Sequence, residues 1–155
     1  MKIFITGTAG FIGFSLAKAL LENNHSVYGY DGITNYYDVK LKNSRNRILN
    51  KYKKFSFTKG MLENKNLLNK TIVKFKPEII IHLAAYQSHD HTSNEFDKLI
   101  TSNIILGLHL VEAMKNEKIT NLINTGTYWQ HYNNEAFNPV SLYAATKQSF
   151  QNILK

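Results

Sequence analysis

Ile3-Phe4-Ile5-Thr6-Gly7-Thr8-Ala9-Gly10-Phe11-Ile12-Gly13 is the stretch that decides the fold. An apolar run leads into a glycine turn, and apolar residues then recur at helical spacing through Leu20. This order predicts a strand, a tight turn and a helix that begins at once. The helix start would offer unpaired N–H donors and a positive dipole end to a phosphate group.

The three glycines of this turn have different expected uses. Gly7 lets the chain leave the strand, Gly10 lets backbone N–H groups approach a pyrophosphate, and Gly13 lets the helix lie close to the strand. The spacing is G-x-x-G-x-x-G rather than the G-x-G-x-x-G of the usual dinucleotide fingerprint. Taken alone, this stretch is therefore also compatible with a glycine-rich turn that binds no ligand.

Length and composition predict one globular domain. The chain has 155 residues, of which 43% are hydrophobic and 19% charged. It contains no cysteine, which excludes disulfides and thiolate zinc sites. No apolar run is long enough for a membrane-spanning helix, and the N-terminus leads directly into the first strand. These features predict a cytoplasmic protein without a signal peptide.

The formal net charge of +8 raises the question of nucleic acid binding. The lysines of the chain are scattered, with one small cluster at Lys51, Lys53 and Lys54. There is neither an arginine-rich stripe nor a pattern of aromatic residues between basic ones. We therefore expect a solvated lysine surface that attracts small anions, and no nucleic acid partner.

A second strand is predicted over residues 26–30, and it ends at Asp31. This carboxylate lies 18 residues past Gly13, where an acidic side chain accepts hydrogen bonds from the adenosine ribose hydroxyls. It would repel a 2′-phosphate, and no arginine follows it closely, so NAD is favoured over NADP. The alternative is an ordinary turn aspartate in Asp31-Gly32.

Strands and helices alternate along the rest of the chain. We expect residues 38–50 to form a helix with Leu41, Ile48 and Leu49 on its apolar side. Further helices are predicted over residues 64–75, 94–117 and after Ser141, and further strands over residues 55–58, 78–85 and 121–124. Small residues follow the strand over 78–85, at the end where ligands bind in open α/β sheets. The alternation predicts an α/β fold with a doubly wound, mostly parallel Rossmann-type sheet.

Tyr143-Ala144-Ala145-Thr146-Lys147 places a phenol and an ammonium on one helix face. A lysine beside a tyrosine favours the phenolate and would lower the tyrosine pKa toward working pH. Tyr143 could then exchange a proton with a sugar hydroxyl or ketone, and Thr125, at the end of the fifth strand, could hydrogen-bond the same oxygen. A surface pair without function is the alternative for the Tyr–Lys pattern alone.

Together these motifs resemble the extended short-chain dehydrogenase/reductase group, specifically the NAD-dependent epimerase/dehydratase family that acts on nucleotide sugars. The matching pieces are T-G-T-A-G-F-I-G at 6–13, Asp31, H-L-A-A at 82–85, Asn103, Thr125 and Y-A-A-T-K at 143–147. The resemblance covers the whole chain but only about the first half of a typical member. It implies that residues 1–155 form an incomplete NAD-binding Rossmann domain, which lacks the last strand or strands and the C-terminal substrate lobe.

The resemblance also implies the roles of particular residues. Tyr143 would be the acid/base, Lys147 would bind the nicotinamide ribose and tune Tyr143, and Thr125 would polarise the sugar C4 oxygen. Hydride would leave the sugar C4 for NAD and give a 4-keto intermediate. No metal is implied. The residues implied to hold NAD are Gly7, Gly10, Phe11, Ile12, Gly13, Asp31, Leu83, Ala84, Ala85, Tyr143 and Lys147.

Two segments favour different substrates, so the function stays open at this point. Residues 31–42, with N-Y-Y-D-x-x-L-K, look like the UDP-glucuronate 4-epimerase branch, whereas T-G-T-Y-W-Q-H-Y-N-N at 125–134 looks closer to reductases and dehydratases making CDP-linked deoxysugars. The third alternative is an inactive, truncated NAD-binding module. A nucleotide-sugar substrate and a homodimer through the long helix and the Tyr–Lys helix are further expectations.

Several other residues carry weaker expectations. His89-Asp90-His91 has no third ligand pattern, so a polar loop is favoured over a metal site. His82 is expected to be a locally hydrogen-bonded strand-end residue. Asn103 either shapes the long helix or lies on its surface. Gly60-Met61 stands where the family often has Gly-Asp, so an adenine contact is lost. The aromatic loop of Tyr128, Trp129, His131 and Tyr132 either stacks on a ligand or covers the edge of the sheet.

Overall fold

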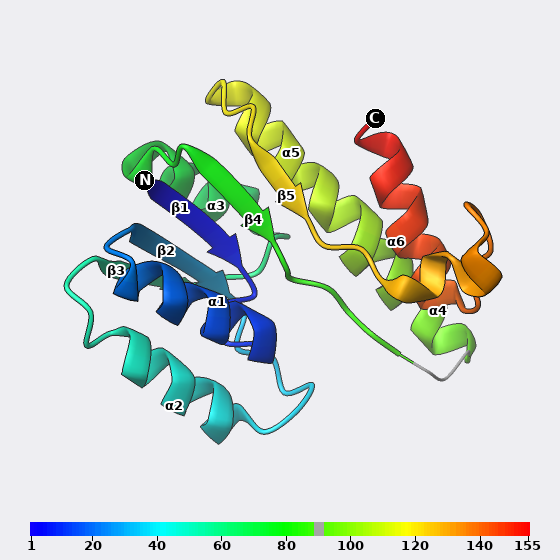
Figure 1. Ribbon diagram of the computed structural model, residues 1–155, viewed down its shortest axis with the longest axis horizontal. Coiled ribbons are helices and arrows are strands. Elements are labelled where there is room, and N and C mark those ends of the chain that lie inside the picture. The colour runs from blue at the N-terminus through cyan, green and yellow to red at the C-terminus, as the bar shows by residue number, and fades with distance from the viewer. Residues whose placement is uncertain (89–91) are drawn as a thin grey trace.

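The computed structural model describes residues 1–88 and 92–155 and shows a parallel sheet between two layers of helices (Figure 1). Within the described residues the sheet has five strands, all parallel, in the order β3-β2-β1-β4-β5. The sheet confirms the predicted Rossmann-type fold, because all carboxyl ends meet at one edge. The strands are β1 Lys2–Thr6, β2 Ser26–Asp31, β3 Phe55–Lys59, β4 Ile79–His82 and β5 Leu122–Asn124.

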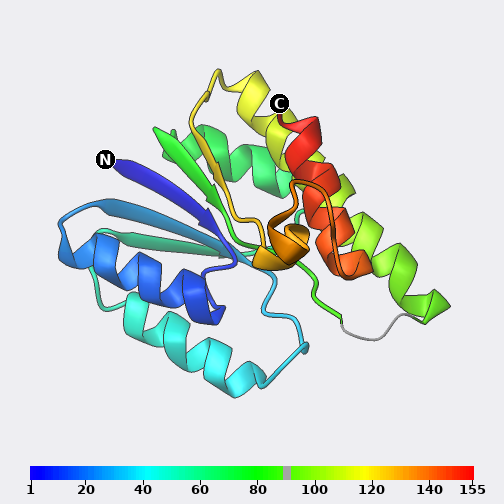
Figure 2. The same cartoon turned by 45° about the vertical axis from the view of Figure 1, so that its right-hand side comes forward.

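Helices cover both faces of the sheet, so the central strand β1 is buried on both sides (Figure 2). Ile3 and Ile5 pack in the core beneath α1 and α2, and Phe4 packs in the opposite core beneath α3 and α5. This arrangement explains the nearly continuous apolar runs of β1 and β4. The α-helices are α1 Phe11–Glu22, α2 Val39–Leu49, α3 Lys65–Phe75, α4 Ser93–Ile100, α5 Leu106–Asn116 and α6 Leu142–Ile153, of which α4 lies beyond the sheet (Figure 1). No helix in the described part of the chain is both long and apolar enough to cross a membrane.

Strand β4 is shorter than predicted and ends at His82 rather than Ala85. The Thr6 hydroxyl accepts the next two backbone N–H groups, from Leu83 at 3.2 Å and Ala84 at 3.1 Å. The Leu83 N–H also reaches the Thr6 carbonyl at 3.3 Å, so the backbone ladder ends there and the side chain alone holds Ala84 as the chain enters the loop that follows.

The single long helix predicted over residues 94–117 is interrupted. A π-helical segment, Thr101–Ile105, separates α4 from α5. Asn103 lies in this wider turn, where it is buried. Its side chain bonds the backbone N–H and C=O of Tyr86, at 2.8 and 2.9 Å, and the Thr146 hydroxyl at 3.0 Å. The surface alternative for Asn103 is wrong, and the widened turn serves a polar contact that a regular α-helix would place elsewhere.

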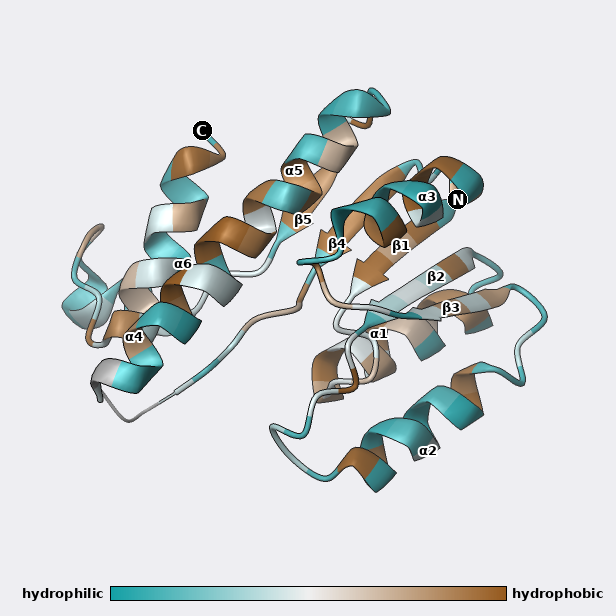
Figure 3. Cartoon of the chain, turned by 180° about the vertical axis from the view of Figure 1, so that it is seen from behind, coloured by the Kyte–Doolittle hydropathy of each residue, from teal (hydrophilic) through white to brown (hydrophobic). Residues whose placement is uncertain are grey.

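Helix α2 does not bury the whole of the side that its apolar residues predict. The helix is hydrophilic along most of its length (Figure 3). Leu49 is buried as expected, but Leu41 and Ile48 are 45% and 39% exposed. Lys42 is buried instead, and its Nζ donates to the Thr34 carbonyl at 2.8 Å. The segment after β2 packs against α2 and supplies polar partners, which the helical periodicity alone does not reveal.

The turn before α1 leads to a stability prediction. A Cβ at Gly13 would overlap the carbonyl oxygen of Gly7, because α1 lies directly against the turn. Gly13→Ala is expected to destabilise the fold by about 3 kcal/mol, which corresponds to a drop of roughly 6–12 °C in the thermal midpoint. Gly10→Ala is the matched control, since a Cβ there comes no closer than 3.1 Å to Gly7. Equal midpoints for the two variants would contradict the predicted close packing.

Candidate functional site

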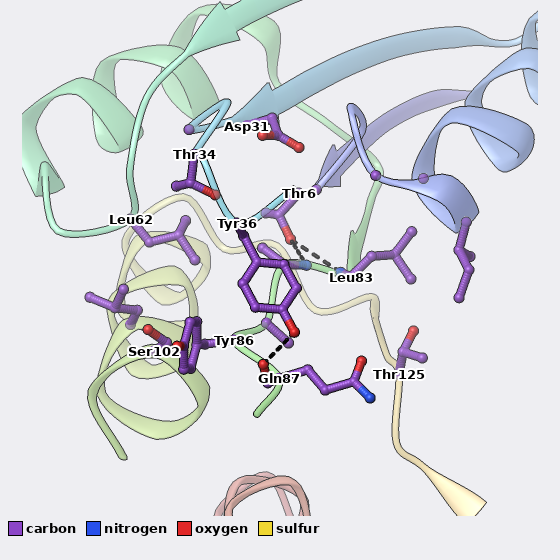
Figure 4. A pocket seen from close by; sticks show the side chains of 18 of the residues that line it. Thr6, Asp31, Thr34, Tyr36, Leu62, Leu83, Tyr86, Gln87, Ser102 and Thr125 are labelled. Atoms are coloured by element: carbon purple, nitrogen blue, oxygen red, sulfur yellow. Dashed lines mark hydrogen bonds between the residues drawn. The ribbon is translucent and has the colours of Figure 1, made fainter. Parts of the chain in front are cut away.

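A cavity of about 610 Å³ lies at the carboxyl edge of the sheet (Figure 4). This is within the size range of small-molecule sites in proteins. Its walls come from the glycine turn, the segments after β2 and β3, the loop after β4, the end of β5 and the start of α6. All the residues predicted from the sequence to bind the cofactor or to take part in catalysis line this cavity. They are Gly7, Gly10, Phe11, Ile12, Gly13, Asp31, Leu83, Ala84, Ala85, Thr125, Tyr143 and Lys147.

The glycine turn opens its backbone toward the cavity. Gly7 has a φ of +81°, and a Cβ there would lie 2.9 Å from the amide nitrogen of Ala84. Gly10 caps α1 without any side-chain hydrogen bond. The first-turn N–H groups of any α-helix lack an intrahelical acceptor, and Gly10 has no side chain that could accept from them. Such a turn suits an anionic ligand.

Asp31 is fixed at the end of β2 by two backbone contacts. One carboxylate oxygen accepts from the Ala9 N–H at 2.9 Å and the other from the Ile33 N–H at 2.7 Å. Each oxygen keeps further acceptor capacity. Asp31 therefore ties β2 to the glycine turn while it faces the cavity.

Sequence reasoning missed the cations beside Asp31. Helix α2 brings Lys42 to the cavity wall, where burial lowers the pKa of Lys42 and the charge of Asp31 acts in the opposite direction. Arg45, one turn further along α2, donates to the Ala9 carbonyl at 3.3 Å and to the Tyr37 hydroxyl at 2.9 Å. Neither is close to Asp31 in sequence, so only the docking of α2 reveals them.

His82 lies at the end of β4, as predicted, and is locally hydrogen-bonded. Its Nδ1 lies 2.8 Å from the Thr6 hydroxyl. Because that hydroxyl already accepts two N–H groups, it donates its proton to Nδ1. Burial, followed by the nearby charge of Lys147, lowers the pKa of His82 to about 3. His82 is therefore a neutral structural residue, and it is not among the residues that line the cavity.

Helix α6 presents Tyr143 and Lys147 to the cavity. The helix is capped by Ser141, whose hydroxyl accepts from the Ala144 N–H at 3.2 Å. Burial lowers the pKa of Lys147 to about 8. Within the described residues, its ammonium makes no hydrogen bond. A buried lysine without a partner, facing a cavity, is a candidate ligand-binding group.

The expected lowering of the Tyr143 pKa is wrong for this structure. Burial raises the pKa of Tyr143, and the facing phenol of Tyr36 acts in the same direction. The spacing puts tyrosine and lysine on one face, but it does not reveal how much water each group loses.

A buried glutamine, which sequence reasoning also missed, connects the loop after β5 to α6. The Gln130 side-chain oxygen accepts from the Thr127 N–H at 2.7 Å. Its amide nitrogen donates to Gln148 at 3.1 Å and Gln151 at 2.8 Å. This network helps to hold Thr125 and α6 at the same cavity.

The remaining sequence expectations have mixed outcomes. Of the aromatic loop, Trp129 lines the cavity, whereas Tyr128 is 75% exposed and lies outside the lining. Met61 lines the cavity beside Gly32 and makes part of its wall apolar. No group of three metal-ligating side chains occurs in residues 1–88 and 92–155, and His89-Asp90-His91 falls outside these described residues.

The fold and site together define a class of protein. A 3-2-1-4-5 parallel sheet carries a glycine turn after the first strand and an aspartate after the second, and a Tyr-x-x-x-Lys helix lies at the same edge. This combination defines an extended short-chain dehydrogenase/reductase type of Rossmann fold. The chain belongs to the NAD dependent epimerase/dehydratase family, whose model matches residues 3–155.

Individual relatives agree with this family. The chain is 39% identical over 158 residues to protein CapI of Staphylococcus aureus, and 36% identical over 160 residues to a probable UDP-glucuronate 4-epimerase of Rhizobium meliloti. These matches cover 96% and 97% of the chain but 47% of each relative. The chain thus spans about half the length of the relatives it matches.

A solved structure matches over the same extent. UDP-glucuronic acid 4-epimerase from Bacillus cereus, in complex with UDP-glucuronic acid and NAD, superposes with a TM-score of 0.89 at 29% identity. The match covers 99% of this chain and 51% of that one.

Proposed function

We propose that this chain is the NAD-binding part of a nucleotide-sugar 4-epimerase of the UDP-hexuronate type. The observation that carries the proposal is that one cavity is lined both by the glycine turn and by Thr125, Tyr143 and Lys147. Residues 1–155 would then hold the cofactor and also supply the groups that react with the sugar.

The cavity residues fit an extended dinucleotide. The uncapped turn at Gly10 suits the pyrophosphate, and Asp31 suits the adenosine ribose hydroxyls. At the opposite end, the buried ammonium of Lys147 suits the second ribose. The apolar wall at Met61 would take the place of the aspartate contact to adenine.

Bound NAD would supply the reversible hydride acceptor for oxidation at a sugar carbon. Tyr143 would take the proton from the reacting sugar hydroxyl and return it, because its phenol faces the cavity beside Lys147. Burial and Tyr36 oppose the phenolate of Tyr143, so this proton transfer would depend on charge brought into the cavity when it is occupied. Thr125 would orient the same oxygen.

The substrate class is supported by the relatives and by the chain's own N-Y-Y-D-x-x-L-K segment. Proteins named as UDP-glucuronate 4-epimerases are 36% and 31% identical to it, each over more than nine-tenths of this chain. Because only about half of their length is matched, the sugar and the predicted homodimer stay proposals for this chain.

The test is turnover by the purified 155-residue chain with NAD and UDP-glucuronate. We expect UDP-galacturonate to appear and to reach the same equilibrium from either sugar, as chromatography of the nucleotide sugars would show. NAD binding without interconversion of the two nucleotide sugars would overturn the epimerase proposal for this chain. The alternative of an inactive NAD-binding module would then remain. Absence of NAD binding would overturn both.

A further inference from the structure

Besides its effect on the pKa of Tyr143, one side chain of the cavity makes a contact that the proposed reaction does not use. Tyr36, in the segment after β2, lines the cavity and is 52% exposed. Its hydroxyl nevertheless donates to the backbone carbonyl of Gln87, in the loop after β4, at 2.6 Å (Figure 4). A half-exposed side chain with a well-defined bond across a cavity calls for an explanation.

The position of this bond follows from the order of the strands. Strand β1 lies between β2 and β4, and the glycine turn follows β1. A bridge from the loop after β2 to the loop after β4 must therefore cross the end of β1. Asp31, at the end of β2, then lies on one side of Tyr36, and Thr125, after β5, lies on the other (Figure 4).

Both ends of the bridge are anchored. On one side, the Tyr37 hydroxyl donates to the Ala9 carbonyl of the glycine turn at 3.3 Å and accepts from Arg45. On the other side, Asn103 holds the backbone of Tyr86. The Tyr36 ring lies between these neighbours, edge-on to both, with centroids 6.4 Å from Tyr37 and 5.5 Å from Tyr86.

We propose that Tyr36 is a cofactor-retaining residue, whose bond to Gln87 closes the cavity over the middle of the bound dinucleotide. The inference rests on the proposed function. The segment after β2 and the loop after β4 are each held by their own hydrogen bonds, and one exposed hydrogen bond joins them. That bond between Tyr36 and Gln87 can break at little cost to the stability of the fold. Release of the dinucleotide requires this contact to break, whereas most of the folded structure stays intact.

Retention suits the proposed reaction. A 4-epimerisation is redox-neutral overall, so the same dinucleotide can serve successive turnovers without exchange. A contact that slows dissociation therefore helps the reaction, whereas a dehydrogenase that must exchange its cofactor every turnover would be slowed by it.

The test is the rate at which NADH dissociates from the chain. The chain is first saturated with NADH, excess NAD is then added, and the NADH fluorescence follows its release. Tyr36→Phe removes only the bond to Gln87 and is expected to raise the rate about fivefold, the equivalent of one net hydrogen bond. Tyr36→Ala also removes the ring and is expected to raise it roughly 30-fold. Thermal unfolding without dinucleotide should change little, because Tyr36 is half exposed.

Tyr132→Phe and Tyr132→Ala are the matched controls. Tyr132 is also 52% exposed, but it lies outside the cavity lining. Unchanged NADH dissociation in both Tyr36 variants, with binding by the parent chain intact, would overturn the retaining role alone. A parent chain that binds neither NADH nor NAD would overturn the proposed function and this role with it.

Discussion

Tyr143→Phe is expected to lower epimerase turnover by about 10²–10⁴-fold while the chain still folds and binds NAD. The variant removes one hydroxyl from a side chain that lines the cavity beside Lys147 and leaves the ring in place. Burial already disfavours the charged form of this phenol, so its loss removes no stabilising charge from the fold. We therefore expect an unfolding free energy within about 1 kcal/mol of the parent.

The measurement is kcat for interconversion of the two UDP-hexuronates, together with the Kd for NAD. Tyr128→Phe is the matched control, because Tyr128 is 75% exposed and does not line the cavity. Loss of turnover with an unchanged Kd would identify Tyr143 as the proton-transfer group. Turnover equal to that of the parent would show that another group moves the proton.

Lys147→Met is expected to make the dinucleotide-free chain more stable at pH 7 and to weaken NAD binding. The lysine is buried with an unpartnered ammonium, and burial lowers its pKa from 10.5 to about 8. At pH 7 the folded chain therefore retains a charge that burial disfavours. Removing it should stabilise the fold by about 3 kcal/mol, or roughly 6–12 °C in the thermal midpoint.

The pH dependence gives the same prediction a second test. Between pH 8 and about 10, Lys147 has lost more of its proton in the folded chain than in the unfolded chain. Because the unfolded chain then binds more protons, this residue makes stability rise with pH across that window. The advantage of Lys147→Met should consequently be largest below pH 8 and shrink above it. Lys115→Met, at an exposed lysine in the last turn of α5, is the control. Lower stability of Lys147→Met than of the parent at pH 7 would contradict the account.

The sequence alone predicted the parts of the molecule that depend on local pattern. The strand, turn and helix from Lys2 to Glu22 form as expected, because apolar spacing and glycines decide them locally. The alternation of strands and helices then restricted the sheet to a parallel order, and the strand ends brought Asp31 and Thr125 to one edge.

What the sequence did not reveal depends on contacts between distant segments. Lys42 is buried because the segment after β2 supplies acceptors for its ammonium. Asn103 is buried because a π-helical turn lets it reach Tyr86 and Thr146. The raised pKa of Tyr143 depends on burial by surrounding elements, which the Tyr–Lys spacing does not contain.

The central claim is that this chain holds a dinucleotide across the glycine turn, and thermal unfolding with and without NAD tests it most directly. At 100 times the Kd, NAD should stabilise the fold by about 2.7 kcal/mol, a rise of roughly 5–11 °C in the midpoint. Gly10→Val is the informative variant, because the φ of −70° at Gly10 tolerates a side chain while the added bulk would occupy the phosphate cradle. A rise in the parent that is lost in Gly10→Val would support the account. A parent midpoint that NAD does not move would contradict it.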